Sequence, residues 1–548
     1  MYKINQLKLN INHSENDFKS KIAKTIKVSV DDIDWSTLII LHKSIDARDK
    51  SNILFVYNIA FDFVGASLRA LEKYEPVKFN PCVVGADTIR PTLTRPVVVG
   101  FGPAGIFASY IFALNGLKPI IIERGKSLED RTKDVEKFFE TMELDEESNV
   151  CFGEGGAGAF SDGKLNTNNK DKTGIYHFVL ETFVKFGADE KILYENMPHI
   201  GTDKLVDVIK NIRNEILRLG GEIYYNTKLT FKDGRMISAP TVDSDTPVVL
   251  AIGNSSRDTF RDLIANGFDL KPKPFAIGYR IAHRQSMIDN AQYGTGSHSS
   301  PLRDKLGPAT YKLTYDVGNG HSVYSFCMCP GGYIINSSNY KDMLSINGMS
   351  YNDRSGMYAN SAIVETISPE DILGSQASPL QAGGWYPPLR SDALKMIEFQ
   401  EMIERRAFEL EKGFIPYATS EGSDICPEEV FKGKAKYSEK LKTVFDDLGL
   451  KFDINDDIEK ALKHFNKIIP GFFSGSQCSP LQYAPQYIIA GVETRTSSPV
   501  KLDRDENYMC NVPNYYPCGE GLGHGGGIMS CAVDGINTAL KIIQTRYI

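Results

Sequence analysis

The sequence lacks the features that mark secreted, metal-binding or repeat proteins. Its nine cysteines among 548 residues are odd in number and scattered without metal-ligand spacing. Neither a disulfide framework nor a metal site is therefore predicted, and reduced thiols in a cytoplasmic protein are expected. The N-terminus has no apolar signal segment, and no internal repeat or low-complexity tract is present.

An excess of positive charge is also missing. The formal net charge is −7, which gives no reason to expect a nucleic-acid partner. Hydrophobic residues make up 42% of the chain and charged residues 24%, as in ordinary soluble globular proteins. The chain is too long for one hydrophobic core, so two or three domains are expected.

The most informative stretch covers residues 95–125, which has the pattern strand, glycine turn, helix, strand. Residues 96–99 and 118–122 are apolar runs that suit buried parallel strands. The turn between them has G-x-G-x-x-G spacing, formed by Gly100, Gly102 and Gly105. In a dinucleotide site these glycines allow the tight turn, the approach of a pyrophosphate and close helix–strand packing.

An acid completes this fingerprint. Glu123 follows Gly105 by 18 residues, near the spacing at which a carboxylate accepts the hydroxyls of an adenosine ribose. Two alternatives are a glycine turn in another α/β unit and a membrane span over 96–122. Glycines, Pro103 and Lys118 interrupt that apolar run and no stop-transfer charges flank it, so a buried βαβ unit is favoured and no membrane association is expected.

Three later segments suit a cofactor, and the last two of them, the Ala251–Gly253 strand end and the Gly519-Glu520 helix start, favour FAD over NAD. A glycine-rich loop at 151–165 could converge backbone N–H groups on an anion or ring. A strand ends at Ala251 and Gly253, and Gly519-Glu520 precedes a glycine-rich helix start near the C-terminus. FAD is long enough to need all of these. The predicted cofactor-binding residues are Gly100, Gly102, Pro103, Ala104, Gly105, Glu123, Arg124, Arg131, Gly155, Gly156, Ser161, Asp162, Ala251, Gly253, Gly519, Glu520, Gly526, Gly527 and Ile528.

The predicted fold class is α/β, in four segments. Residues 1–90 have the pattern of a small α+β, ferredoxin-like domain, with strands near 4–11, 35–44 and 52–63 and helices near 17–25 and 67–73. Residues 91–257 form the first part of a Rossmann-like FAD-binding domain. Residues 258–485 are an inserted α+β substrate domain, a β-sheet followed by helices. Residues 486–548 return to the FAD-binding domain.

Several motifs also carry a resemblance. The segments RPVVVGFGPAGIFAS, FGEGGAGAFSDGKL, PHIGTDKL, LAIGNSSRDTF, YSFCMCPGG, NGMS, GVETRTSSPV and YPCGEGLGHGGGIMSCAVDGI are similar to a bacterial family of FAD-dependent dehydrogenases, itself similar to the glutathione-reductase-type FAD superfamily. The resemblance spans nearly the whole chain. It implies bound FAD, an inserted substrate domain and oxidoreductase activity, but no particular substrate. Asn254 stands where that family more often has histidine, and His524-Gly525 where Tyr-Ala is commoner.

Catalytic residues are less defined, because flavin itself carries hydride transfer and needs at most one acid or base from the protein. His524, beside the proposed flavin helix, and Arg280 and His283, which could bind an anionic substrate, are the candidates. Arg354 and Arg495 are candidate anion clamps. Cys327 and Cys329 could be a redox pair on one face of a strand, but buried structural cysteines are favoured, since C-x-x-C spacing is absent.

The predicted function is an FAD-dependent oxidoreductase that transfers hydride at flavin N5 on a small molecule. No second glycine fingerprint is present, so NAD(P)H as a transient reductant, the substrate itself and a partner protein stay open as electron sources. Alternative functions are a flavin monooxygenase, a flavin-containing RNA-modifying or RNA-binding protein, and a redox-responsive interaction protein with structural FAD.

Overall fold

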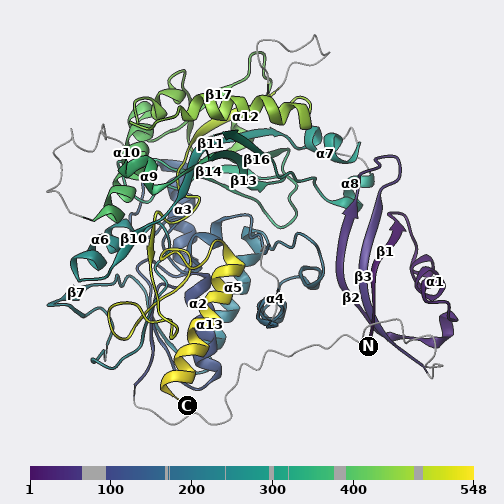
Figure 1. The fold of residues 1–548 in the computed structure, drawn as a ribbon, viewed down its shortest axis with the longest axis horizontal. Helices are drawn as coiled ribbons and strands as arrows, with labels where there is room; N and C mark the ends of the chain where they lie inside the picture. Colours follow the sequence, from purple (N-terminus) through teal and green to yellow (C-terminus); the bar gives the residue numbers. More distant parts are fainter. Residues whose placement is uncertain are drawn as a thin grey trace.

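The computed structural model has a mixed α/β fold with three parts (Figure 1). It describes residues 1–64, 94–166, 171, 173–240, 242–294, 301–318, 320–374, 391–473 and 486–547. The N-terminal unit lies to one side of a body in which a parallel sheet and a larger, mostly antiparallel sheet are stacked (Figure 1). In the described part of the chain no helix combines the length and apolar character needed to cross a membrane.

The N-terminal unit contains β1 (Tyr2–Asn10), α1 (Glu15–Ile26), β2 (Ile33–Asp46) and β3 (Leu54–Phe63). Its antiparallel sheet has the order β1-β3-β2, so β3 inserts between the two strands that flank the helix. The helix predicted at 67–73 falls outside the described residues. A main-chain hydrogen bond from Lys43 to the Tyr194 carbonyl, at 2.7 Å, joins β2 to the body.

The five-stranded sheet is parallel and has the order β22-β9-β4-β5-β6. Its strands are β4 (Val97–Val99), β5 (Ile120–Ile122), β6 (Glu222–Tyr224), β9 (Val248–Leu250) and β22 (Tyr515–Pro517). The β4, β5 and β9 side chains are all buried, which explains their uninterrupted apolar sequences. Strand β6 ends at Tyr224, and Asn226 two residues later adopts a positive φ of 51° that turns the chain.

Three long helices cover one face of this sheet: α2 (Pro103–Leu114), α5 (Thr202–Arg218) and α13 (Ile528–Arg546) (Figure 1). Helix α2 is apolar on nearly every side because it packs between the sheet, α5 and α13. Gly535 permits the close approach of α13, since a Cβ there would collide with the Ala104 carbonyl on α2. The first and last segments of the predicted FAD-binding domain therefore share one core.

The larger sheet has seven strands in the order β12-β13-β16-β11-β20-β17-β19. They are β11 (Phe275–Arg284), β12 (Thr314–Gly318), β13 (His321–Cys329), β16 (Tyr358–Ile367), β17 (Ile415–Thr419), β19 (Ala435–Tyr437) and β20 (Ile488–Glu493). Strand β20 was predicted to belong to the returning segment after residue 485. It instead pairs with β11 and β17, because its apolar residues complete the core of this sheet.

The chain passes between the two parts along a pair of antiparallel strands, β10 (Leu270–Pro272) and β21 (Val500–Leu502). Helices α10 (Asp392–Glu411) and α12 (Ile454–Ile468) pack on the larger sheet. The remaining elements are α3 (Leu128–Thr141), α4 (Ile175–Lys185), α6 (Arg257–Ala265), α7 (Gln285–Tyr293), α8 (Pro301–Leu306), α9 (Pro369–Leu373), α11 (Pro427–Val430), β7 (Phe231–Lys232), β8 (Arg235–Met236), β14 (Tyr333–Asn336), β15 (Ile346–Met349) and β18 (Phe431–Lys432).

Candidate functional site

A cavity of about 710 Å³ opens at the carboxyl edge of the parallel sheet and extends to the larger sheet. Its size lies within the range of small-molecule and cofactor sites. Sixteen of the nineteen predicted cofactor-binding residues line it: Gly100, Gly102, Pro103, Ala104, Glu123, Arg124, Gly156, Ser161, Asp162, Ala251, Gly253, Gly519, Glu520, Gly526, Gly527 and Ile528. Gly105, Arg131 and Gly155 do not line the cavity.

The glycine turn forms one end of this cavity. Gly100 has a φ of 94°, and a Cβ at that position would collide with the Ala251 carbonyl of the neighbouring strand. Gly105 faces the Gly100 carbonyl with no room for a side chain, so its role is to seat α2 against the turn. Gly102 caps α2 and is open towards the cavity. The helix thus presents its first N–H groups and positive dipole end to the cavity.

Glu123 is buried at the same end and anchors the turn. Its carboxylate accepts backbone hydrogen bonds from Phe101 at 2.8 Å, Gly125 at 2.9 Å and Gly153 at 3.1 Å. A carboxylate has about four acceptor positions, so one stays available to a ligand hydroxyl. Glu123 therefore fixes the glycine turn and the 151–165 loop and keeps capacity for a ribose.

Arg131 stabilises the glycine-rich loop from behind. Its guanidinium is fully buried and donates to the carbonyls of Asn149, Val150, Gly153 and Glu154 at 2.6–3.2 Å. Direct contact with a ligand in the cavity is therefore not supported for Arg131, because its donors are directed at the loop backbone.

Arg124 lines the cavity but already has carboxylate partners. It donates to both oxygens of Asp258 at 3.0 Å and to Glu147 at 2.8 Å, and it lies 3.8 Å over the Phe152 ring. These carboxylates hold its pKa above the usual range against the opposing effect of burial. Arg124 thus provides a positive surface that is fixed in position.

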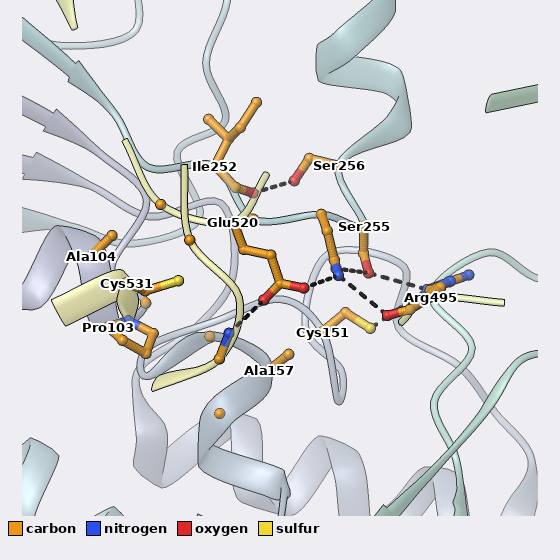
Figure 2. A pocket seen from close by; sticks show the side chains of 18 of the residues that line it. Pro103, Ala104, Cys151, Ala157, Ile252, Ser255, Ser256, Arg495, Glu520 and Cys531 are labelled. Carbon is orange, nitrogen blue, oxygen red and sulfur yellow. Dashed lines mark hydrogen bonds between the residues drawn. The ribbon is translucent and has the colours of Figure 1, made fainter. Parts of the chain in front are cut away.

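A second helix N-terminus meets the cavity at Glu520, which Figure 2 shows at its centre. Glu520 accepts from the Asn254 amide at 2.8 Å and from the Gly527 N–H at 3.4 Å, just before α13 begins. Burial raises the pKa of Glu520 to about 6. Asn254, the position that departs from the resembled family, therefore positions this carboxylate.

The far end of the cavity is lined by charged side chains. Asp162 is buried and pairs with Lys164 at 3.2 Å and with Arg354, and it also accepts from the Ser350 hydroxyl. Burial alone would raise the pKa of Asp162, but Lys164 and Arg354 lower it to about 2. Lys164 keeps a raised pKa for the reciprocal reason. Arg354 is thus committed to an internal carboxylate.

None of the three candidate catalytic residues lines the cavity. Arg280 is fully buried and pairs with Glu493 at 2.6 Å. His283 contacts the Phe472 carbonyl at 2.8 Å, and burial lowers its pKa to about 4, so it is neutral at physiological pH. His524 points to the Leu502 carbonyl at 2.7 Å, and burial lowers its pKa as well.

Arg495 does line the cavity and belongs to a buried network. It shares Glu404 with Arg257, which lies at 2.8 Å from that carboxylate, and its remaining nitrogen lies 3.5 Å from the Cys151 sulfur (Figure 2). The cavity is also lined by Cys151 and Lys164, which lie in the predicted 151–165 loop but were not singled out, and by Lys273, which was not predicted. The position of Lys164 directly after Gly163 in that loop is a signal that could have found it.

These residues fit a dinucleotide cofactor. Two helix N-termini, a glycine turn with no side chain in the way and two separate carboxylates line one continuous cavity. In the described part of the chain no group of three or more His, Cys, Asp or Glu could hold a metal ion.

Comparisons with known proteins agree with this chemistry. Residues 274–496 match the family described as "FAD-dependent protein, C-terminal domain-like", which supports FAD as the cofactor, and residues 1–62 match a domain of unknown function. An uncharacterised protein of Clostridium beijerinckii is 40% identical over 567 residues, covering 99% of this chain and 98% of its own.

Two solved structures are only distantly similar to this chain. L-amino acid deaminase from Proteus vulgaris is 11% identical with a TM-score of 0.35, over 85% of this chain and 96% of its own. CtdE in complex with FAD is 11% identical with a TM-score of 0.28, over 82% of each chain. At such scores neither likeness identifies an activity.

Proposed function

The chain belongs to the same family as the Clostridium beijerinckii protein, and from this premise we propose that it is an FAD-dependent oxidoreductase acting on a small molecule. The observation that carries the proposal is the single cavity that joins the glycine turn to the Glu520 helix start. When bound, FAD supplies the hydride chemistry, so the protein need only bind, orient and tune it.

The glycine-turn end would hold the adenosine and pyrophosphate. Gly102 and the α2 N-terminus offer backbone N–H groups and a positive dipole, which favour phosphate oxygens. Glu123 has one acceptor position left for a ribose hydroxyl. Of the predicted set, Gly105, Gly155 and Arg131 would act indirectly, by shaping the turn and loop.

The Glu520 end would hold the ribityl chain and the flavin ring. The N-terminus of α13 starts after Gly527 and opens to the cavity, where its positive dipole end would favour negative charge on a bound ring. We expect Glu520, oriented by Asn254, to accept a hydroxyl of the ribityl chain.

The proposed reaction is of the dehydrogenase or reductase type, with NAD(P)H as one transient electron donor. The cavity reaches beyond Glu520 to Lys164, Lys273 and Cys327, which leaves space lined by cations for an anionic or polar substrate. His524, Arg280 and His283 would then serve packing and pairing, and no general acid or base among them reaches the cavity.

A steric substitution at Gly102 tests the proposal. Gly102 has an extended backbone, and a Cβ there would lie 3.5 Å from the Gly156 Cα, an ordinary contact. Gly102→Ala should therefore keep most FAD, whereas the branched Gly102→Val should fill the space before α2. Both proteins are purified, refolded with excess FAD, and assayed for flavin absorbance and for FAD released on denaturation.

We expect the purified wild type to be yellow, Gly102→Ala to retain FAD, and Gly102→Val to lose at least tenfold in FAD affinity with an unchanged circular dichroism spectrum. A colourless wild type that cannot be reconstituted with FAD would falsify the proposal. If the valine variant bound FAD as tightly as the wild type, the cofactor would not bind at the glycine turn.

A further inference from the structure

Two cysteines lie where β13 reaches the cavity. Phe326 pairs with Ala362, and Cys329 pairs with Asn360. Strand β13 therefore has one more residue than β16 between these two pairs, which makes a β-bulge in β13. Cys327 sits in this bulge with a φ of 45°, in the left-handed region. β-Bulges re-aim side chains beside functional sites. Cys327 is half-buried and lines the cavity, whereas Cys329 is fully buried.

Positive groups surround the pair. The Lys164 ammonium lies 3.6 Å from the Cys329 sulfur and also lines the cavity. The Arg280 guanidinium donates to the Cys327 carbonyl at 3.2 Å. A side chain at Gly348 would collide with both that guanidinium and the Cys329 sulfur, so the two lie together. Each of these two cations also pairs with a buried carboxylate: Lys164 with Asp162, which Arg354 shares, and Arg280 with Glu493.

The two thiols differ in the direction in which their pKa values are shifted. The neighbouring Cys329 thiol, together with Lys164 and Arg280, holds the pKa of Cys327 below its ordinary value, and this thiol donates to the Cys327 carbonyl at 3.3 Å. The neighbouring Cys327 side chain, together with burial, raises the pKa of Cys329. Cys327, which lines the cavity, is therefore the member of the pair whose thiolate is favoured.

Four other described cysteines, Cys426, Cys510, Cys518 and Cys531, have raised rather than lowered pKa values. Burial raises the pKa of Cys510 to about 11 and also raises the pKa of Cys518 and Cys531. A hydrogen bond with Glu428 raises the pKa of the exposed Cys426. Thiolates are the reactive form of cysteine, so these four should react less readily than Cys327 at neutral pH.

We propose that Cys327 and Cys329 are a redox-active dithiol of this site, with Cys327 as the attacking thiolate and Cys329 as the second sulfur. Residues two apart on a strand are separated by about 6.6 Å between Cα atoms. This is near the upper limit of the Cα separations found in disulfides.

The proposal rests on the proposed function, because it gives the substrate class as a thiol or disulfide compound. On oxidation one S–S bond forms, the remaining S–H proton is released, and the electron pair passes to the oxidised isoalloxazine ring or to an external disulfide. On reduction by two external thiols the S–S bond breaks and those thiols are joined in a disulfide; one of their two protons returns to Cys329, the other is released, and Cys327 is again a thiolate.

The first test measures alkylation of flavin-free protein by iodoacetamide between pH 5 and 10, with each cysteine peptide followed by mass spectrometry. The midpoint for Cys327 should lie at least one pH unit below that for Cys426. Lys164→Met should raise the Cys327 midpoint and leave that of Cys426 unchanged. A Cys327 midpoint equal to or above that of Cys426 overturns the proposal.

The second test treats flavin-free protein with oxidised glutathione and looks for a peptide joining Cys327 and Cys329, two hydrogens lighter than the reduced form. We expect it in the wild type and in Cys426→Ser, and its loss in Cys329→Ser, which should instead keep glutathione on Cys327. Two unmodified thiols in the oxidised wild type overturn the proposal.

The third test counts electrons in FAD-loaded protein during anaerobic dithionite titration. Oxidised wild type should take up about four electrons per flavin and Cys329→Ser about two, since each couple accepts a pair. Equal uptake overturns the proposal. Flavin content is measured separately, so a protein without FAD refutes the proposed function, while the first two tests still decide the cysteine pair.

Discussion

The two ends of the cavity are built from different chemistry. At the glycine-turn end, Gly100 and Gly102 leave the backbone N–H groups of α2 open, and Glu123 is satisfied by three main-chain donors. At the larger sheet, Asp162–Lys164 and Arg280–Glu493 place side-chain charges beside two cysteines. A main-chain site holds a cofactor with little dependence on protonation, whereas a charged side-chain site can tune a reactive group.

Removing one carboxylate from each end should produce the largest contrast. Glu493→Ala leaves the Arg280 charge without its partner, and both side chains are at most 4% exposed. Such a loss costs about 3–5 kcal/mol of unfolding free energy. Glu147→Ala, at the glycine-turn end, removes a partner of Arg124 that is 52% exposed, while Asp258 stays in place. It should cost under about 1 kcal/mol.

Urea unfolding of both variants measures this contrast. Glu493→Gln serves as the control for packing, because it keeps the side-chain volume and one acceptor and should fall between wild type and the alanine variant. Equal losses of unfolding free energy in the two alanine variants would contradict the expected difference, because the Arg280–Glu493 pair would then contribute no more than a surface pair.

The larger sheet should also respond to pH through Glu365 on β16. This carboxylate is fully buried, and neither oxygen accepts a hydrogen bond from the described residues. Burial, with Asp457 and Asp371 nearby, raises its pKa to about 8. The folded state therefore holds a proton that the unfolded state releases above about pH 4.5. Stability is lost as pH rises from there to about 8.

Glu365→Gln should remove this slope and stabilise the protein by at least roughly 2 kcal/mol at pH 8.5, with little effect at pH 4.5. Thermal or urea unfolding at several pH values measures it. Glu459→Gln is a control on α12, because Glu459 is 39% exposed and should not alter the slope. An unchanged pH slope in Glu365→Gln would assign the pH response to another group.

The smallest effect on stability is expected at the hydrogen bond between Asn254 and Glu520. Asn254→Ala removes the 2.8 Å hydrogen bond to Glu520, which should cost about 1 kcal/mol at pH 8 and less at pH 5, where Glu520 is protonated. Ser497→Ala also lines the cavity but loses only a 3.4 Å contact, so it should be neutral. A loss that is the same at both pH values would show that the Glu520 charge is not involved.

The sequence predicted best the part of the site that is formed by backbone atoms. The glycine spacing of Gly100, Gly102 and Gly105 predicted a strand–turn–helix unit, and β4, α2 and β5 have that arrangement. It predicted least well the side chains whose partners come from elsewhere. Arg280 and His283 on β11 are of residue types suited to catalysis. Both are buried against Glu493 and Phe472, and neither lines the cavity.

The sequence by itself determined the parallel βαβ unit, because glycine spacing and apolar runs are local and dictate the backbone they allow. It also indicated FAD, through motifs at both ends of the chain. Only the tertiary structure decided that β20 joins the larger sheet, that Asn254 meets Glu520, and that Lys164 lies beside Cys329. Burial and charge pairing join residues over a hundred positions apart, and these contacts depend on three-dimensional proximity that local sequence does not encode.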